Sequence, residues 1–187
     1  MKWSRRKSTK ASQKLPDDYV EQCARSALRK AKNIKEFDIP SSLWVNSDRT
    51  QVIYAPGDKM TWAETGAKQV GSVGVEEKRV FTLMVSIASD GQVLPFQAIY
   101  EGKTEKSVPS KDARNRRECD DIGCCFHFSG MKTYWSNQET MRSFVEEILV
   151  PYFDRQRKRL GLPANQKAMW TIDVYSVHRS EEFRAYM

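Results

Sequence analysis

With 187 residues, of which 40% are hydrophobic, the chain is long enough for one domain with a buried core, or for one domain with an appendage. No stretch is long and apolar enough to span a bilayer, and no apolar run follows the basic start MKWSRRKSTK. These features argue against a disordered chain, a membrane protein and a secreted protein. They favour a nuclear or cytoplasmic protein.

The positive charge is concentrated at the N-terminus. Of the net charge of +7, residues 1–40 carry +6 and residues 41–187 carry +1. A basic arm suits nucleic acid because its binding to phosphates releases counterions, although a solvated, mobile terminus is an equally open interpretation. The side chains expected to contact nucleic acid are Arg5, Arg6, Lys7 and Lys10. The sequence therefore divides into a basic arm with one helix (1–40) and a core domain (41–187).

The first predicted element is a helix that begins at Pro16 and ends near Lys35. Asp17 and Asp18 lie at its start, where acidic side chains favour the positive end of the helix dipole. Apolar residues then recur at helical spacing, and Pro40 closes the segment.

After this helix the pattern changes to that of strands. Four strands are predicted, at residues 43–45, 50–54, 79–88 and 93–100. The first ends at the polar residues Asn46-Ser47-Asp48, and a tight turn separates it from the second. The last two form a hairpin around Asp90-Gly91, in which Pro95 indicates an edge or a bulge.

Residues 101–137 are polar and lack periodicity, so they are predicted to form loops or short elements over the sheet. The strongest predicted helix is Thr140–Arg159, which Pro151 should kink or divide. Its buried stripe includes Phe144, Ile148 and Leu149.

A buried strand at 168–174 and a helix from Ser180 to Met187 follow. The order of elements indicates an α/β domain with a mixed sheet.

Two short apolar strands each lead to an aspartate, Asp48 in the first and Asp173 in the last. We expect these two strands to be neighbours, with the hairpin strands around 79–100 on the other flank of the first, so that both carboxylates lie at one edge of the sheet. Two-metal phosphoryl transfer uses such oxygen ligands to hold magnesium or manganese ions about 4 Å apart. Aspartates at strand ends also cap turns and helices, and the two acids alone do not separate these interpretations.

Four cysteines in a chain without a secretory signal favour free thiols. The cluster of Cys119, Cys124 and Cys125 with His127 is a weaker indication of zinc, because it contains no CxxC pair.

Several segments resemble, in the same order, the DDE superfamily endonucleases, the transposase catalytic cores related to pogo and mariner elements. The resemblance covers roughly residues 38–187 and is greatest to transposase-derived proteins of fungi. Its segments are 46–50, 61–68, 77–79, 81–82, 90–91, 94–104, 134–136, 172–180 and 182–183.

The resemblance implies a ribonuclease-H-like mixed sheet flanked by helices and a metal-dependent activity that cleaves and joins DNA. It implies that Asp48 and Asp173 are catalytic residues that bind magnesium or manganese. It places Thr50, Lys68 and His178 in supporting roles around the metal or the phosphate. For His178, packing on the sheet is the alternative, and for Lys68 it is a plain β-turn at Gly66–Lys68. Glu64 is expected to be structural.

Two departures from the family point to an impaired enzyme. Arg49 stands where the family has Gln or Glu, so its charge competes with a metal ion unless it points to the opposite face. The family's third acid follows a further strand, so we expect a core that is incomplete at its C-terminus. Whether the chain is an enzyme stays open. The alternative is a non-catalytic module that binds DNA or other partners, alone or as a homo-oligomer.

Overall fold

The computed structural model describes residues 16–53, 80–173 and 176–187. The described residues up to Asp38 form one compact unit, and those from Ile39 onwards form a second. In the first unit, helix α1 (Tyr19–Glu36) confirms the helix predicted there. None of its residues is buried within the unit, and Arg25 forms an ion pair with Glu21 one turn away. The helix is therefore held by its own backbone and by exposed pairs of this kind.

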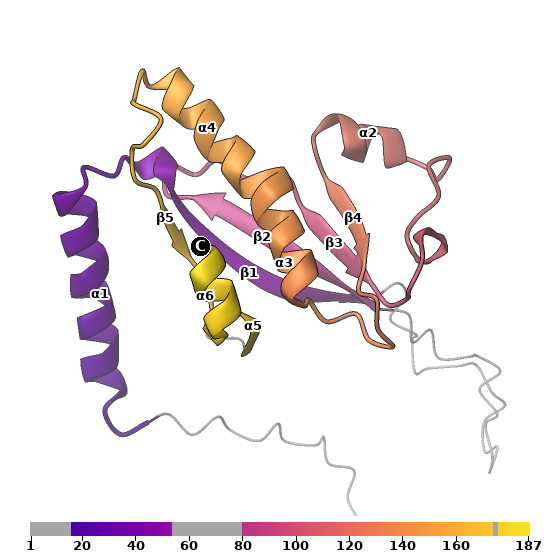
Figure 1. The fold of residues 1–187 in the computed structure, drawn as a ribbon, viewed down its shortest axis with the longest axis horizontal. Coiled ribbons are helices and arrows are strands. Elements are labelled where there is room, and N and C mark those ends of the chain that lie inside the picture. Colours follow the sequence, from indigo (N-terminus) through magenta and orange to yellow (C-terminus); the bar gives the residue numbers. More distant parts are fainter. Residues whose placement is uncertain (1–15, 54–79, 174–175) are drawn as a thin grey trace, which may run out of the picture. The chain divides into compact units, whose positions relative to one another are not determined.

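The second unit is built on a mixed five-stranded sheet in the order β4-β3-β2-β1-β5 (Figure 1). Its strands are β1 (Trp44–Ile53), β2 (Val80–Ala88), β3 (Gln97–Tyr100), β4 (Cys125–Phe128) and β5 (Met169–Thr171). Strands β1, β2 and β3 are antiparallel, whereas β4 runs parallel to β3 and β5 runs parallel to β1. The predicted mixed α/β fold is confirmed, with β5 beside β1 and the hairpin strands on the other flank.

Strand β1 is continuous where the sequence predicted two strands and a turn. Its outward residues Asn46, Asp48 and Thr50 are exposed, and they alternate with the buried Val45 and Ser47. This period of two is that of a strand with one solvated face. The predicted turn is therefore wrong, because Asn46 and Asp48 lie on the exposed face of a long strand and Ser47 lies on its buried face.

Strand β3 is shorter than predicted, because it begins at Gln97 and only an isolated bridge joins Val93 to Ile87. Pro95 lies between Val93 and Gln97 and has no backbone N–H for the ladder. Residues 101–137 contain short elements, as predicted. The pairing of β4 with β3 was not predicted, because four residues give too short a pattern.

The predicted helix 140–159 is one continuous run of three segments. They are α3 (Gln138–Phe144), the π-helical η3 (Val145–Leu149) and α4 (Val150–Arg159). Pro151 lacks the N–H that an α-helix would direct to the carbonyl of Glu147, and the wider π turn precedes it. The expected kink or division thus takes the form of a π turn.

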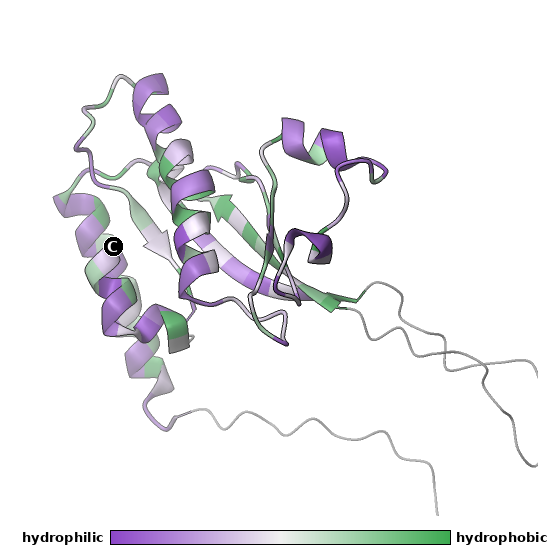
Figure 2. Cartoon of the chain, turned by 45° about the vertical axis from the view of Figure 1, so that its right-hand side comes forward, coloured by the Kyte–Doolittle hydropathy of each residue, from purple (hydrophilic) through white to green (hydrophobic). Residues whose placement is uncertain are grey.

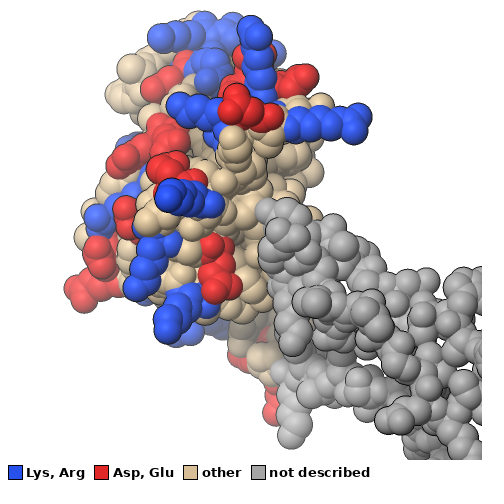
Figure 3. All heavy atoms as spheres, turned by 90° about the vertical axis from the view of Figure 1, so that its right-hand side faces the viewer, with Lys and Arg blue, Asp and Glu red and all other residues tan. Residues whose placement is uncertain are grey.

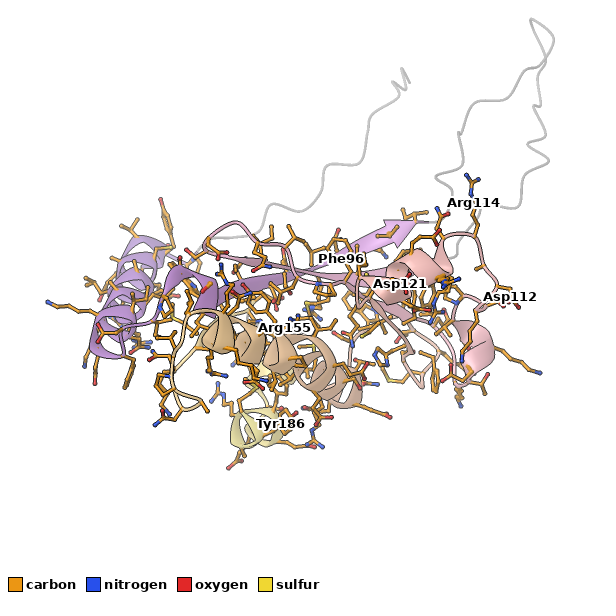
Figure 4. The ribbon with its side chains drawn as sticks, turned by 90° about the horizontal axis from the view of Figure 1, so that it is seen from above. Phe96, Asp112, Arg114, Asp121, Arg155 and Tyr186 are labelled. Carbon is orange, nitrogen blue, oxygen red and sulfur yellow. The ribbon has the colours of Figure 1, made fainter. Side chains whose placement is uncertain are left out.

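This helix covers one face of the sheet and buries Phe144, Ile148 and Leu149, as predicted. Figure 4 shows α3, α4 and α6 (Glu181–Tyr186) on the same side of the sheet. Ser180 caps α6 by accepting a hydrogen bond from the backbone N–H of Phe183, 3.1 Å away. Phe183 thereby enters the core that lies between the helices and the sheet.

The remaining short elements are η1 (Ser41–Leu43), η2 (Glu105–Ser107), α2 (Arg116–Asp121) and α5 (Ser176–Arg179). The C-terminal half of α4 is strongly hydrophilic (Figure 2). Within the described ranges, no helix has the length and apolar character needed to cross a membrane.

Candidate functional site

Strands β1 and β5 bring the two predicted acids to the same level of the sheet. The strands are parallel, with Asn46 opposite Thr171. Asp48 and Asp173 each lie two residues further along, Asp48 within β1 and Asp173 just past the end of β5. The register therefore places both acids at the carboxyl end of β5.

The carboxylate of Asp173 is engaged through both of its oxygens. Oδ2 accepts a hydrogen bond from Nη2 of Arg49 at 3.0 Å. Oδ1 lies 3.0 Å from Nδ1 of His178, which is also 3.0 Å from the backbone oxygen of Asp173. The Arg49 side chain is only 11% exposed, against 47% for Asp173, so a largely buried cation compensates the charge of a half-exposed acid.

His178 is fixed by the hydrophobic core. It is buried, with its ring centroid 6.5 Å from that of Trp170 and 5.9 Å from that of Phe183. Trp170 in turn stacks on Phe144 at 5.6 Å. His178 thus packs against the core, as the structural alternative predicted, and it also lies beside Asp173, while its supporting role around a metal or phosphate stays a prediction.

Asp48 and Arg49 project from opposite faces of β1. Arg49 is in register with the buried Met84, whereas Asp48 is in register with Val85. Arg49 therefore points to the helix side, where its Nη1 donates to Oγ of Ser136 at 2.8 Å. The exposed Asp48 accepts a hydrogen bond from the backbone N–H of Arg49 at 2.7 Å. The structure groups Asp173, His178 and Arg49, while Asp48 forms a hydrogen bond within its own strand.

This arrangement does not fit a magnesium or manganese ion as it stands. Carboxylate oxygens are the ligands that these ions prefer. Both oxygens of Asp173, however, already face Arg49 or His178. A divalent cation would have to displace the guanidinium, with which it competes for the same charge.

A cavity of about 400 Å³ adjoins this group and is lined by Arg49, Thr50, Gln51, Thr82, Tyr134 and Trp135. Tyr134 and Trp135 stack at 5.8 Å between centroids, and Trp135 is half exposed. Tyr134 is held by the Thr82 hydroxyl, which donates to its backbone oxygen at 2.7 Å. Predicted residue Thr50 thus lies beside Arg49 and beside an aromatic pair to which the sequence assigned no role.

The remaining predicted site residues lie outside the described residues. They are Arg5, Arg6, Lys7, Lys10, Glu64, Gly66 and Lys68.

A second cluster of metal-ligand side chains joins β4 to the π turn. Ligand atoms of Cys125, His127 and Glu147 all lie within 4.8 Å of one another. Burial, followed by a hydrogen bond to Glu147, raises the pKa of the Cys125 thiol to about 12. The sequence drew attention to the cysteines and to His127, but it missed Glu147, which lies twenty positions beyond His127. All four cysteines are free thiols, as predicted.

Charges of both signs are interspersed on the face that Figure 3 shows. The described residues on this face therefore form no broad basic patch for a phosphate backbone. The near-neutral balance of residues 41–187 agrees with this picture.

Comparisons with known proteins give one weak structural similarity. No family model matches the sequence, and no curated protein matches it. The fold is similar to a solved structure described as "Mos1 transposase paired-end complex with left transposon end", with 11% sequence identity and a TM-score of 0.29. The match covers 70% of this chain and 47% of that chain, so this chain spans about half the length of its neighbour. At this identity and TM-score the match supports neither an activity nor a ligand.

Proposed function

We propose that this chain is a transposase-type nuclease core that works on DNA, and that its own Arg49 blocks its phosphoryl-transfer site. The observation that carries the proposal is the parallel pairing of β1 with β5, whose register brings Asp48 and Asp173 to one level, with Asp48 on the face of β1 opposite to Arg49. The resemblance of residues 38–187 to DDE endonucleases supplies the chemistry expected of two such acids. The proposed location is nuclear or cytoplasmic, and a DNA partner favours the nucleus.

Arg49 determines whether Asp173 is free to bind a metal ion. Its guanidinium contributes the positive charge that a divalent cation would otherwise bring to Asp173, and it lies 3.0 Å from that carboxylate. His178 holds the other oxygen of Asp173 and is itself fixed by the aromatic core. A compensated carboxylate attracts a metal ion weakly, so we expect the native chain to bind DNA without cutting it.

Two features of the chain suit contact with DNA. The arm cations Arg5, Arg6, Lys7 and Lys10 suit the phosphate backbone, because the core is close to neutral. The half-exposed Trp135 offers a ring on which an unpaired base can stack. Arg49 lines the same cavity and adds a cation beside that ring.

The test compares the native chain with Arg49→Gln, which restores a residue type that the family has at this position. We expect Arg49→Gln to bind Mn²⁺ at least tenfold more tightly in a calorimetric titration, about 1.4 kcal/mol. Adding Asp173→Asn should abolish the gain. Arg142→Gln is the matched control, because Arg142 also pairs with an acid, Glu182, outside this site.

Plasmid nicking with Mg²⁺ or Mn²⁺ is the second readout. The native chain should leave supercoiled DNA intact. Cleavage by the native chain that Asp48→Asn and Asp173→Asn abolish would show that Arg49 does not block the site. An Arg49→Gln protein that binds Mn²⁺ no better than the Arg142→Gln control would contradict the proposal as well.

The second candidate function is a non-catalytic DNA-binding module, which the double engagement of Asp173 favours. Deleting residues 1–14 removes six cationic side chains: Lys2, Arg5, Arg6, Lys7, Lys10 and Lys14. In gel shifts at two salt concentrations, the deletion should weaken sequence-independent binding and flatten its salt dependence by about 0.9 per lost phosphate contact. Loss of DNA binding on truncation, together with an inert Arg49→Gln, would establish the module and exclude the blocked nuclease.

A further inference from the structure

We propose that Cys125, His127 and Glu147 form a zinc-binding site at the β4 flank of the sheet. This flank is the edge opposite β5, so the site is independent of the acids at the β1–β5 end. It does not rest on the proposed function.

Strand β4 supplies two of the three ligands. Cys125 and His127 are two residues apart in β4, so their side chains lie on the same face of the strand. Parallel pairing with β3 fixes the strand, with Cys125 opposite Gln97 and His127 opposite Ile99. Both ligand side chains are half-buried, and the backbone that carries them is held by the sheet.

The π turn η3 supplies the third ligand. Glu147 is the central residue of Val145–Leu149, between the buried residues Val145 and Ile148 that fix the turn on the sheet. Such single π turns inside α-helices occur frequently at functional sites. The Glu147 side chain is 48% exposed and faces His127, so one of its oxygens reaches the cluster while the group keeps access to solvent.

The separations suit a tetrahedral metal ion better than a hydrogen bond. Nε2 of His127 lies 3.5 Å from Oε2 of Glu147, which exceeds the usual hydrogen-bond length. Zinc bonds of about 2.0–2.2 Å to nitrogen and oxygen in tetrahedral geometry place such ligand atoms about 3.4 Å apart. Among the described residues, the buried Nε2 of His127 has no hydrogen-bond partner. All three ligand atoms lie within 4.8 Å, so closure requires movements of roughly 1 Å.

The ligand types select zinc over magnesium. Thiolate and imidazole are ligands for zinc and similar metals, whereas magnesium requires oxygen ligands. Binding displaces the thiol proton of Cys125 to solvent, because the thiolate is the ligand form. Three protein ligands leave the fourth tetrahedral position open to water or to a small anion, the coordination that catalytic zinc sites have.

The experiment titrates the full chain with Zn²⁺ against a chromophoric chelator. We expect one equivalent bound per chain and at least ~100-fold weaker binding in Cys125→Ser and in Glu147→Gln, beyond the ~10–100-fold typical of outer-shell partners. Cys119→Ser and Asp173→Asn are the matched controls and should bind as the native chain does. Co²⁺ in place of Zn²⁺ should show a thiolate charge-transfer band that Cys125→Ser removes.

Glu147→Gln keeps the test decisive if Cys125→Ser disturbs the edge strand, because the Glu147 side chain is half exposed. Zinc affinity that is unchanged in Glu147→Gln and Cys125→Ser would overturn the proposal. A cobalt complex of the native chain without the thiolate band would also overturn it. Loss of zinc binding in Asp173→Asn would assign the ion to the other flank, and the proposal would again fail.

Discussion

The two flanks of the sheet hold their candidate site residues in different ways. At the β5 flank, Asp173 follows a strand whose Trp170 packs against Phe144, and His178 packs against Phe183. At the β4 flank, Cys125 and the rest of its cluster are only half-buried or exposed, and they come from a four-residue strand and a π turn. The first group is held directly by aromatic side chains of the core, whereas the second is held by the pairing of β4 with β3 and by the buried residues Val145 and Ile148 of the π turn.

The electrostatic contrast between the flanks is as clear as the structural one. The protein itself supplies a cation to Asp173 through Arg49. Around Cys125, burial and the acids Glu147 and Asp120 act together to raise the pKa of the thiol. The β5 flank is thus compensated internally, while the β4 flank is a cluster that a metal cation would stabilise. A sequence pattern typical of metal binding therefore does not predict whether the charge of its acids is already neutralised by a neighbouring cation.

The largest expected effect is the loss of stability when the core beside the β5 flank is opened at Phe183. Phe183 is 2% exposed and contacts both Trp170 and His178. Phe183→Ala should lower the free energy of unfolding by about 3–5 kcal/mol, because it leaves a cavity between α6 and the sheet. Urea denaturation monitored by tryptophan fluorescence measures this loss.

Phe126 in β4 is the control for that comparison. It is half-buried and lies under the guanidinium of Arg116, 4.0 Å from ring centroid to Cζ. Phe126→Ala should cost only about 1–2 kcal/mol, since little apolar area and one cation–π contact are lost. Equal losses for the two variants would show that the core supports both flanks alike.

The second prediction concerns the pH dependence of stability that the buried Tyr152 causes in the core between the two flanks. Burial, and then the negative charge of Asp90, raise the pKa of Tyr152 on α4 to about 12. The folded state therefore keeps a proton that the unfolded state loses above pH ~10, so stability falls as the pH rises from 10 to 12. Two pKa units correspond to at most roughly 2–3 kcal/mol.

Tyr152→Phe isolates this contribution, because it removes the ionisable hydroxyl and keeps the ring. Its hydroxyl lies 3.3 Å from Oε1 of Gln92, so little stability should be lost at neutral pH. Thermal unfolding of the variant should show a shallower decline between pH 10 and 12 than that of the native chain. Identical slopes would mean that Tyr152 ionises in the folded protein as readily as in the unfolded one.

The sequence predicted the parts of the fold that have long, regular patterns. The helix over 140–159 and the pairing of β5 with β1 are confirmed, because their apolar residues share one face or one register. Strand β1 was divided wrongly, since alternating polar residues on a solvated face look like a turn when the partner strand is unknown. The β3–β4 pairing depends on four residue pairs whose members lie 28 positions apart in the sequence, a contact that local periodicity does not encode.

The same reasoning explains what could be predicted of the two sites. Asp48 and Asp173 each stand next to an apolar strand, so the sequence identified both as candidates. Their neighbours could not be deduced, because the contact of Arg49 with Asp173 joins residues 124 positions apart. Glu147 came close to His127 only through the π turn that precedes Pro151. In both sites the residue types were predictable and their partners were not.

The smallest expected effect is that of breaking the surface ion pair of α6. It tests whether Phe183 or this ion pair holds α6 in place. Arg142 on α3 donates from Nη2 to Oε1 of Glu182 at 2.6 Å, and its Cζ lies 5.3 Å from the ring centroid of Tyr186. The Arg142 and Glu182 side chains are 39% and 60% exposed, so solvent screens their attraction. A double-mutant cycle with Arg142→Ala and Glu182→Ala should give a coupling energy of only about 0.2–1 kcal/mol.

Added salt should reduce this coupling energy and leave the loss of stability caused by Phe183→Ala unchanged, because burial of an aromatic ring is not screened by ions. A coupling above ~2 kcal/mol that persists in salt would mean that the ion pair, rather than the aromatic core, holds α6 and with it His178 beside Asp173.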